Sequence, residues 1–138
     1  TNVGIEHAIN PLKQDIMEAL KQITSNNMPT VVIDATGNLD AINNAFQYLA
    51  HSGRYVLVGL QKGNISFSHP EFHKREATLM SSRNADVSDF MHVMDCIKQG
   101  LVKPINYITH RVAFDEVTNH FESCLDPNSK VVKAIVEF

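Results

Sequence analysis

The side chains best suited to bind a ligand follow three apolar runs, each of which ends in glycine or polar residues. The three segments are Thr36-Gly37-Asn38, Gly59-Leu60 and Arg83-Asn84. Glycine lets a backbone approach a ligand closely, hydroxyl and amide groups hydrogen-bond to it, and a guanidinium binds an anion or a carboxamide. If the three runs are parallel strands, these segments share the edge of the sheet at which α/β folds bind ligands.

Each of these residues also has a purely structural interpretation. Gly37 and Gly59 suit turns with positive φ, or close backbone contacts, as well as they suit a ligand. Arg83 is either a solvated loop residue or a contact to a bound anion or carboxamide. Lys133, among apolar residues near the end of the chain, either extends to solvent or binds a phosphate. The residues alone leave these alternatives open.

Metal binding has weaker support in the sequence. His69 and His73 are four residues apart, a spacing at which two imidazoles on a helix can share an ion. Pro70 lies between them, however, and only Glu71 and Glu76 are near enough to add a ligand. We therefore expect a solvated loop, and we expect the other five histidines to serve surface or packing roles.

The sequence lacks the motifs of several common binding and catalytic sites. The chain contains no G-x-G-x-x-G, Walker A or G-x-S-x-G pattern, so a complete dinucleotide site is not encoded. Cys96 and Cys124 fall in helical patterns without a second pair at metal-ligand spacing, so free thiols are expected.

Residues 31–60 contain a complete strand–helix–strand unit that positions two of the three binding segments. Val31–Ile33 is a short β-branched run, and Tyr55–Val58 is a second one. From Leu39 the apolar residues recur every three or four positions, which predicts an amphipathic helix of about a dozen residues. Two buried strands joined by a helix form a right-handed parallel crossover, the building block of a doubly wound α/β sheet.

Further elements are predicted on both sides of this unit. Helices are expected from Leu12 to Thr24, over one turn within His69–Glu76, from Asp86 or Ser88 to Gly100, and from Asp115 to Leu125. Strands are expected at His7–Asn10, Ala77–Ser82, Tyr107–Val112 and Lys130–Phe138, the last containing Lys133. The length of 138 residues, 43% of them hydrophobic, predicts a single domain.

Charge and hydropathy restrict the partners. A formal net charge of −3 without a run of basic residues argues against binding to nucleic acid or to an anionic membrane. The apolar runs are too short to span a bilayer, and the first residues lack a basic-then-apolar signal pattern. We expect a cytoplasmic protein with no nucleic-acid or membrane partner.

Five motifs together resemble the carboxyl-terminal part of the medium-chain dehydrogenase family. In chain order they are VVIDATGN…AINNAF…L…SGRYVLVGL, HKREATLMSSRNA, DF…V…IKQG, ITHRVAFDEV and KVVKAIVEF. Their order and spacing, over nearly the whole chain, are similar to those of zinc-type alcohol and polyol dehydrogenases, particularly the sorbitol, threonine and galactonate-type branch. The resemblance implies a partial Rossmann domain, a doubly wound parallel sheet that binds a dinucleotide cofactor, without its first two strands. Residues 2–10 resemble the stretch that leads into and includes the third strand.

By position, the resemblance assigns ten residues to the binding of NAD or NADP. Thr36, Gly37 and Asn38 would line the cofactor, and Val58, Gly59 and Leu60 would lie beside the nicotinamide. The backbone of Ser82, Arg83 and Asn84 would meet the carboxamide, and Lys133 would lie near the pyrophosphate. Arg83 is also a candidate for reaching the substrate, as in the polyol branch. His69 and His73 match no zinc ligand of the family.

The resemblance further implies that residues 1–138 are the carboxyl-terminal portion of the dinucleotide-binding domain of a dehydrogenase. The glycine-rich turn, the catalytic domain and its zinc ligands would all precede this chain. Zinc is therefore expected in the parent protein but not bound by this chain, to which no catalytic residue is assigned. The expected partners are the nicotinamide dinucleotide, a small alcohol, polyol or sugar acid, and further copies of the protein. The isolated chain is not expected to be active.

The alternative is a non-catalytic α/β binding or oligomerisation module that keeps a dehydrogenase scaffold. In the sheet order 3-2-1-4-5-6, loss of strands 1 and 2 leaves Val31–Asp34 as an open edge. We expect this edge to pair with another chain or with the amino-terminal segment. Ala77–Ser82 resembles the strand through which family members dimerise.

Overall fold

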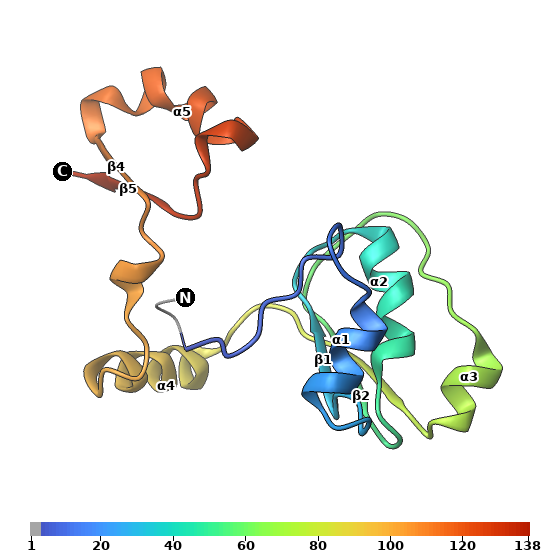
Figure 1. Cartoon of the computed structure of the whole chain (residues 1–138). Helices are drawn as coiled ribbons and strands as arrows, with labels where there is room; N and C mark the ends of the chain where they lie inside the picture. The colour runs from blue at the N-terminus through green and yellow to red at the C-terminus, as the bar shows by residue number, and fades with distance from the viewer. Residues whose placement is uncertain (1–3) are drawn as a thin grey trace. The chain divides into compact units, whose positions relative to one another are not determined.

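The computed structural model describes residues 4–138, whose contacts group them into two compact units (Figure 1). The first unit is Glu6–Asn84, and the second is Ala85–Phe138 together with residues 4 and 5. Each unit has its own parallel sheet, which confirms the α/β class. Among residues 4–138 no strand pairing joins the two sheets. The single domain predicted from the length stays a prediction.

The first unit is built on three parallel strands in the order β1-β2-β3, and all three strands were predicted. They are β1 (Val31–Asp34), β2 (Arg54–Leu57) and β3 (Thr78–Ser81). The register aligns Val31 with Arg54 and Arg54 with Thr78, so the carboxyl ends of the strands lie side by side. β1 pairs only with β2 among the described residues, and its other edge is open.

Helices pack on one face of this sheet. They are α1 (Ile16–Ile23), α2 (Leu39–Ala45), continued by the 3₁₀ turn η1 (Phe46–Tyr48), and α3 (His69–Lys74). The core forms where α2 and η1 meet β2: Tyr55 is 0% exposed and donates its hydroxyl proton to the carbonyl oxygen of Ile42 at 3.0 Å. The ring of Phe46 meets Tyr55 edge-on, with 4.8 Å between the ring centroids.

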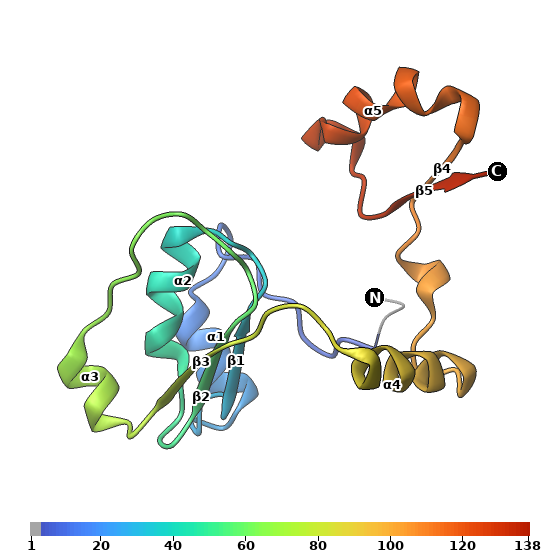
Figure 2. The same cartoon turned by 180° about the vertical axis from the view of Figure 1, so that it is seen from behind.

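The opposite face of the same sheet is open. Seen from behind, the strands lie in front of α1 (Figure 2). Alternate residues of β1 and β3 on this face remain exposed, with Val31 at 43%, Ile33 at 63% and Met80 at 46%. All-parallel sheets are normally covered on both faces, so this apolar face is unusual for its class.

The second unit pairs β4 (His110–Ala113) with β5 (Ala134–Glu137) in parallel. Its helices are α4 (Val87–Lys98) and α5 (Val117–Leu125), with 3₁₀ turns η2 (Pro104–Asn106), η3 (Phe114–Glu116) and η4 (Pro127–Ser129). Asp86 begins α4 with a capping box completed by Asp89, as the sequence allowed. All the buried residues of the described chain belong to the first unit.

Two predicted elements near the amino end were wrong in type or position. The strand predicted at His7–Asn10 does not form, because an isolated extended segment has no neighbour to satisfy its backbone groups. Asn2 and Val3, which belong to the same resemblance, lie outside the described residues. The helix predicted from Leu12 begins only at Ile16, where the Asp15 side chain accepts a hydrogen bond from the Glu18 amide and acts as the cap.

Near the carboxyl end two further predictions need correction. Asp115 does not cap α5: it lies in the turn η3, and the helix begins after Glu116 without a side-chain cap. Lys133 lies just before β5 rather than within a strand, because the pairing with β4 begins at Ala134. No helix of residues 4–138 is long and apolar enough to cross a membrane.

Candidate functional site

The turn after β1 is organised by the carboxylate of Asp34, the last residue of the strand and only 5% exposed. One of its oxygens accepts the hydroxyl proton of Thr36 at 2.6 Å, and the other accepts the Gly37 amide at 3.4 Å. The carbonyl oxygen of Asp34 accepts the amides of Val58 and Gly59, both at 2.9 Å. One residue therefore holds the turn after β1 against the end of β2.

The two glycines of the predicted site lie against each other. Gly37 has φ +61°, and a Cβ added to it would lie 2.9 Å from the carbonyl oxygen of Leu60. A Cβ on Gly59 would collide with the Gly37 amide nitrogen and would lie 2.6 Å from Oδ2 of Asp34. The structural interpretation therefore holds for both glycines, because Gly37 has a positive φ and both lie in a close backbone contact.

An open cleft of about 660 Å³ lies at the carboxyl ends of β2 and β3. Its lining includes six of the ten residues assigned by the sequence, namely Val58, Gly59, Leu60, Ser82, Arg83 and Asn84. Ile42 of α2 and Ile65 complete its apolar part. Its volume is that of an ordinary small-molecule pocket.

The polar groups of the cleft are available to a ligand. The side chains of Ser82, Arg83 and Asn84 make no hydrogen bond or ion pair with any of residues 4–138. Asn84 also has a positive φ of +60°, which turns the chain at the cleft. On the apolar side Leu60 is 93% exposed. The cleft thus combines a cation, an amide and a hydroxyl with an exposed apolar surface, which suits a flat, polar-edged ring.

The other four assigned residues do not line this cleft. Thr36 and Gly37 lie behind it, in the turn held by Asp34. Asn38 is used as the cap of α2, since its side-chain oxygen accepts the Ala41 amide at 3.0 Å. Lys133 belongs to the second unit, where its carbonyl oxygen accepts the Thr109 amide at 2.9 Å.

Asp34 is the functional residue that the sequence analysis missed. It was named there only as the last residue of the open edge Val31–Asp34. A signal was present: an acidic residue that directly follows an apolar β run has to be buried or to cap something, and a hydroxyl two residues later offers it a partner.

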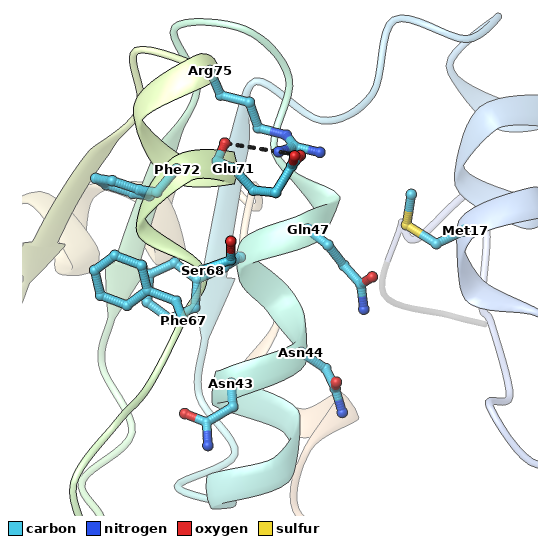
Figure 3. A pocket seen from close by; sticks show the side chains of 10 residues that line it. Met17, Asn43, Asn44, Gln47, Phe67, Ser68, Glu71, Phe72 and Arg75 are labelled. Carbon is cyan, nitrogen blue, oxygen red and sulfur yellow. Dashed lines mark hydrogen bonds and ion pairs between the residues drawn. The ribbon is translucent and has the colours of Figure 1, made fainter.

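A second cavity, of about 360 Å³, lies away from the strand ends, between α1, α2 and α3 (Figure 3). Met17 of α1 faces amide side chains of Asn44 and Gln47 across it (Figure 3). Arg75 is already engaged here, because its guanidinium pairs with Glu71 at 2.9 Å and also donates to the carbonyl oxygen of Leu49. The cavity offers amide groups but no free charge.

A zinc site of the catalytic kind does not fit the described residues. Among residues 4–138 no three His, Cys, Asp or Glu side chains come together in a way that could hold a metal ion. The polar groups of the cleft at β2 and β3 instead suit a nicotinamide ring, whose carboxamide both donates and accepts hydrogen bonds.

Known proteins resemble this chain in sequence and in fold. L-galactonate-5-dehydrogenase of Escherichia coli K12 is 36% identical over 130 residues, which are 94% of this chain and 38% of that protein. Sorbitol dehydrogenase of Halalkalibacterium halodurans is 25% identical over 83% of this chain and 34% of its own length. The chain thus spans less than two-fifths of these relatives.

Solved structures share the fold over almost the whole chain. An Escherichia coli oxidoreductase of unknown specificity superposes with a TM-score of 0.90 over 99% of this chain and 39% of its own, at 18% identity. An alcohol dehydrogenase from E. coli CFT073, solved with NADH, gives 0.84 over 98% of this chain and 39% of its own, at 24% identity. Residues 1–99 match the sequence profile of the zinc-binding dehydrogenases. The chain is a member of the zinc-binding dehydrogenase family.

Proposed function

We propose that this chain is part of an NAD(P)-dependent alcohol, polyol or sugar-acid dehydrogenase and forms the nicotinamide side of its cofactor site. The observation that carries the proposal is the cleft after β2 and β3, where the side chains of Arg83 and Asn84 lie beside exposed apolar residues and bond to no other residue of 4–138. Family membership and the NADH found in a related fold support it. When bound, the nicotinamide would accept or donate hydride.

The residues of the cleft have distinct roles in this proposal. Val58 and Leu60 would give one face of the ring an apolar contact. Arg83 and Asn84 would both bind its carboxamide. Asp34 would act as a positioning residue, because it holds the turn after β1 against Gly59 without lining the cleft. Thr36, Gly37 and Asn38 would support this wall from behind. Lys133 remains a proposed pyrophosphate contact in the parent protein.

Arg83 would select the substrate. A guanidinium with no internal partner binds a carboxylate in bidentate fashion, and two relatives act on galactonate derivatives according to their names. We therefore favour a sugar acid over an uncharged alcohol as the substrate of the parent protein. The acid group would pair with Arg83 while the secondary alcohol faces the nicotinamide.

Ligand-observed NMR on the 138-residue chain tests the cofactor half of the proposal. We expect saturation transfer to nicotinamide mononucleotide but not to adenosine monophosphate, because the chain carries the nicotinamide wall alone. Arg83→Gln should reduce the transfer several-fold. Arg54→Gln, an exposed arginine at the other end of β2, is the matched control and should leave it unchanged. Equal transfer to both nucleotides, or no effect of Arg83→Gln, would contradict the proposal.

A non-catalytic oligomerisation module is the second candidate. The open edge of β1 and the exposed face that carries Ile33 and Met80 favour it. No saturation transfer to either nucleotide, together with a stable oligomer, would select this function over the first.

A further inference from the structure

The segment that contains His69 and His73 is helical, which changes what these two residues can do. α3 spans His69–Lys74, and Pro70 lies in its first turn. Proline is well tolerated there because the first amides of a helix have no internal partner. The two histidines are therefore one helical turn apart on the same side of α3, the arrangement in which two imidazoles at this spacing can share an ion.

The two imidazoles face each other at close range. Their ring centroids are 5.8 Å apart, and both residues are exposed. Rings that share one ion through metal–nitrogen bonds of about 2.0–2.1 Å have centroids roughly 1 Å closer than this. A small change in side-chain torsions would bring them to that separation.

Both histidines also have free ring nitrogens. Four of the remaining histidines have a polar partner: His51 pairs with Glu76, His92 with Cys96, His110 with Thr109 and His120 with the Glu116 carbonyl. Within the part of the chain that the structure describes, His69 and His73 make only the ring contact with each other. They line one surface hollow together with Lys74 and Glu76, and the Glu76 carboxylate is paired with His51.

We propose that His69 and His73 form a two-histidine site for a late first-row divalent ion such as Ni²⁺, Cu²⁺ or Zn²⁺. Neutral imidazoles suit these ions, and two on one helical turn act as a chelate. Within residues 4–138 no third metal-binding side chain joins them, so water completes the coordination. The site is separate from the cleft at the carboxyl ends of β2 and β3 and does not depend on its function.

Calorimetric titration of the 138-residue chain with Ni²⁺ tests the site. We expect His69→Gln and His73→Gln each to weaken the tightest binding at least tenfold, because one imidazole alone cannot chelate. The double variant should bind no better than either single one. His120→Gln, whose ring already bonds to its own helix, is the control and should bind as the unmodified chain does.

A competing pair has to be separated from this one. His92 and Cys96 are also one turn apart, with 3.7 Å between Nε2 and Sγ, and could bind the ion instead. If His92→Gln removes the tight site while the His69/His73 double variant keeps it, the proposal is wrong. It is also wrong if each single variant removes only half of the bound metal, since the two histidines would then bind independently. Circular dichroism of each variant confirms that α3 and the fold are retained.

Discussion

At the scale of single residues, the contact between Gly37 and Gly59 is the most sensitive point of the candidate site. Two turns from different strands approach so closely that neither glycine has room for a side chain. The contact fixes where β1 ends relative to β2, and with it the position of Val58 and Leu60 in the cleft.

Gly59→Ala should therefore destabilise the chain by about 1–3 kcal/mol, the usual range for an overpacked site. The added methyl would collide with the Gly37 backbone, which has no flexible end to give way. Gly63→Ala is the matched control, because its nearest neighbour is the flexible Gln61 side chain, and it should change stability by less than about 0.5 kcal/mol. Urea unfolding followed by circular dichroism measures both. Equal stability of the two variants would show that the backbones at Gly37 and Gly59 can move apart.

Tyr55 gives the fold a specific dependence on pH. Burial, reinforced by the negative charge of Asp34 and by Tyr48, raises the pKa of Tyr55 from 10.0 to about 12. The folded state thus favours the neutral phenol, and its contribution is fully present below pH 10 and is lost as the pH rises from about 10 to 12. The unfolding free energy should fall by on the order of 2 kcal/mol over this interval.

Tyr55→Phe provides the control for this prediction. It removes the titrating group together with the hydrogen bond to Ile42, so the variant should be less stable at pH 8 but should lose less stability above pH 10. Burial also raises the pKa of Tyr48, which leaves a smaller decline of the same sign in the variant. Unfolding curves at pH 8, 10 and 11 compare the two proteins, and parallel declines would refute the role of Tyr55.

At the scale of elements, Asn38 shows how a residue assigned to a ligand can serve a helix instead. Its side chain caps α2. Asn38→Ala should cost about 1 kcal/mol of stability, while Asn38→Asp, which keeps the cap, should cost little. Thermal unfolding distinguishes them. Loss of nucleotide binding in a fully stable Asn38→Asp protein would instead indicate direct contact with the cofactor.

Elements with strong local signals could be predicted from sequence. The β-branched runs predicted β1 and β2, and of the two capping candidates for α4, Asp86 and Ser88, the structure uses Asp86. The strand at His7–Asn10 failed because strand formation depends on a neighbour, which local sequence cannot supply. The predicted helix start at Leu12 was wrong because the cap is Asp15, whose side chain accepts the Glu18 amide, and α1 begins after it.

The candidate site was predictable as a set of strand ends but not as a cavity. Parallel strands bring Gly59 and Arg83 to one edge whatever the loops do, and the cleft contains both. Which side chains remain free depends on hydrogen bonds formed in three dimensions, and those bonds engage Asn38 but not Asn84. The role of Asp34 likewise depends on the second turn lying against the first.

At the scale of the whole molecule, the open edge of β1 should drive association. We expect the chain to form dimers or larger species through this strand, and Ile33→Lys should shift it toward monomer, because a charge on an edge strand opposes pairing. Leu12→Lys, an equally drastic change at a 93% exposed residue before α1, should leave association unchanged. Light scattering after size exclusion measures both.

Amide exchange in the same samples locates the association. Pairing should protect the Val31–Asp34 amides in the unmodified chain more than in the Ile33→Lys variant. A chain that remains monomeric while these amides exchange slowly would rule out pairing between chains.

The uncovered face of the first sheet lowers the heat-capacity change of unfolding. The heat capacity of a protein rises on unfolding in proportion to the apolar surface that was buried in the native state. Since Val31, Ile33 and Met80 already contact water, they add less to this quantity than the same residues in a sheet covered on both sides. The stability of this chain should therefore vary less steeply with temperature than that of a domain of equal length, and any molecule that covers the face should restore the curvature.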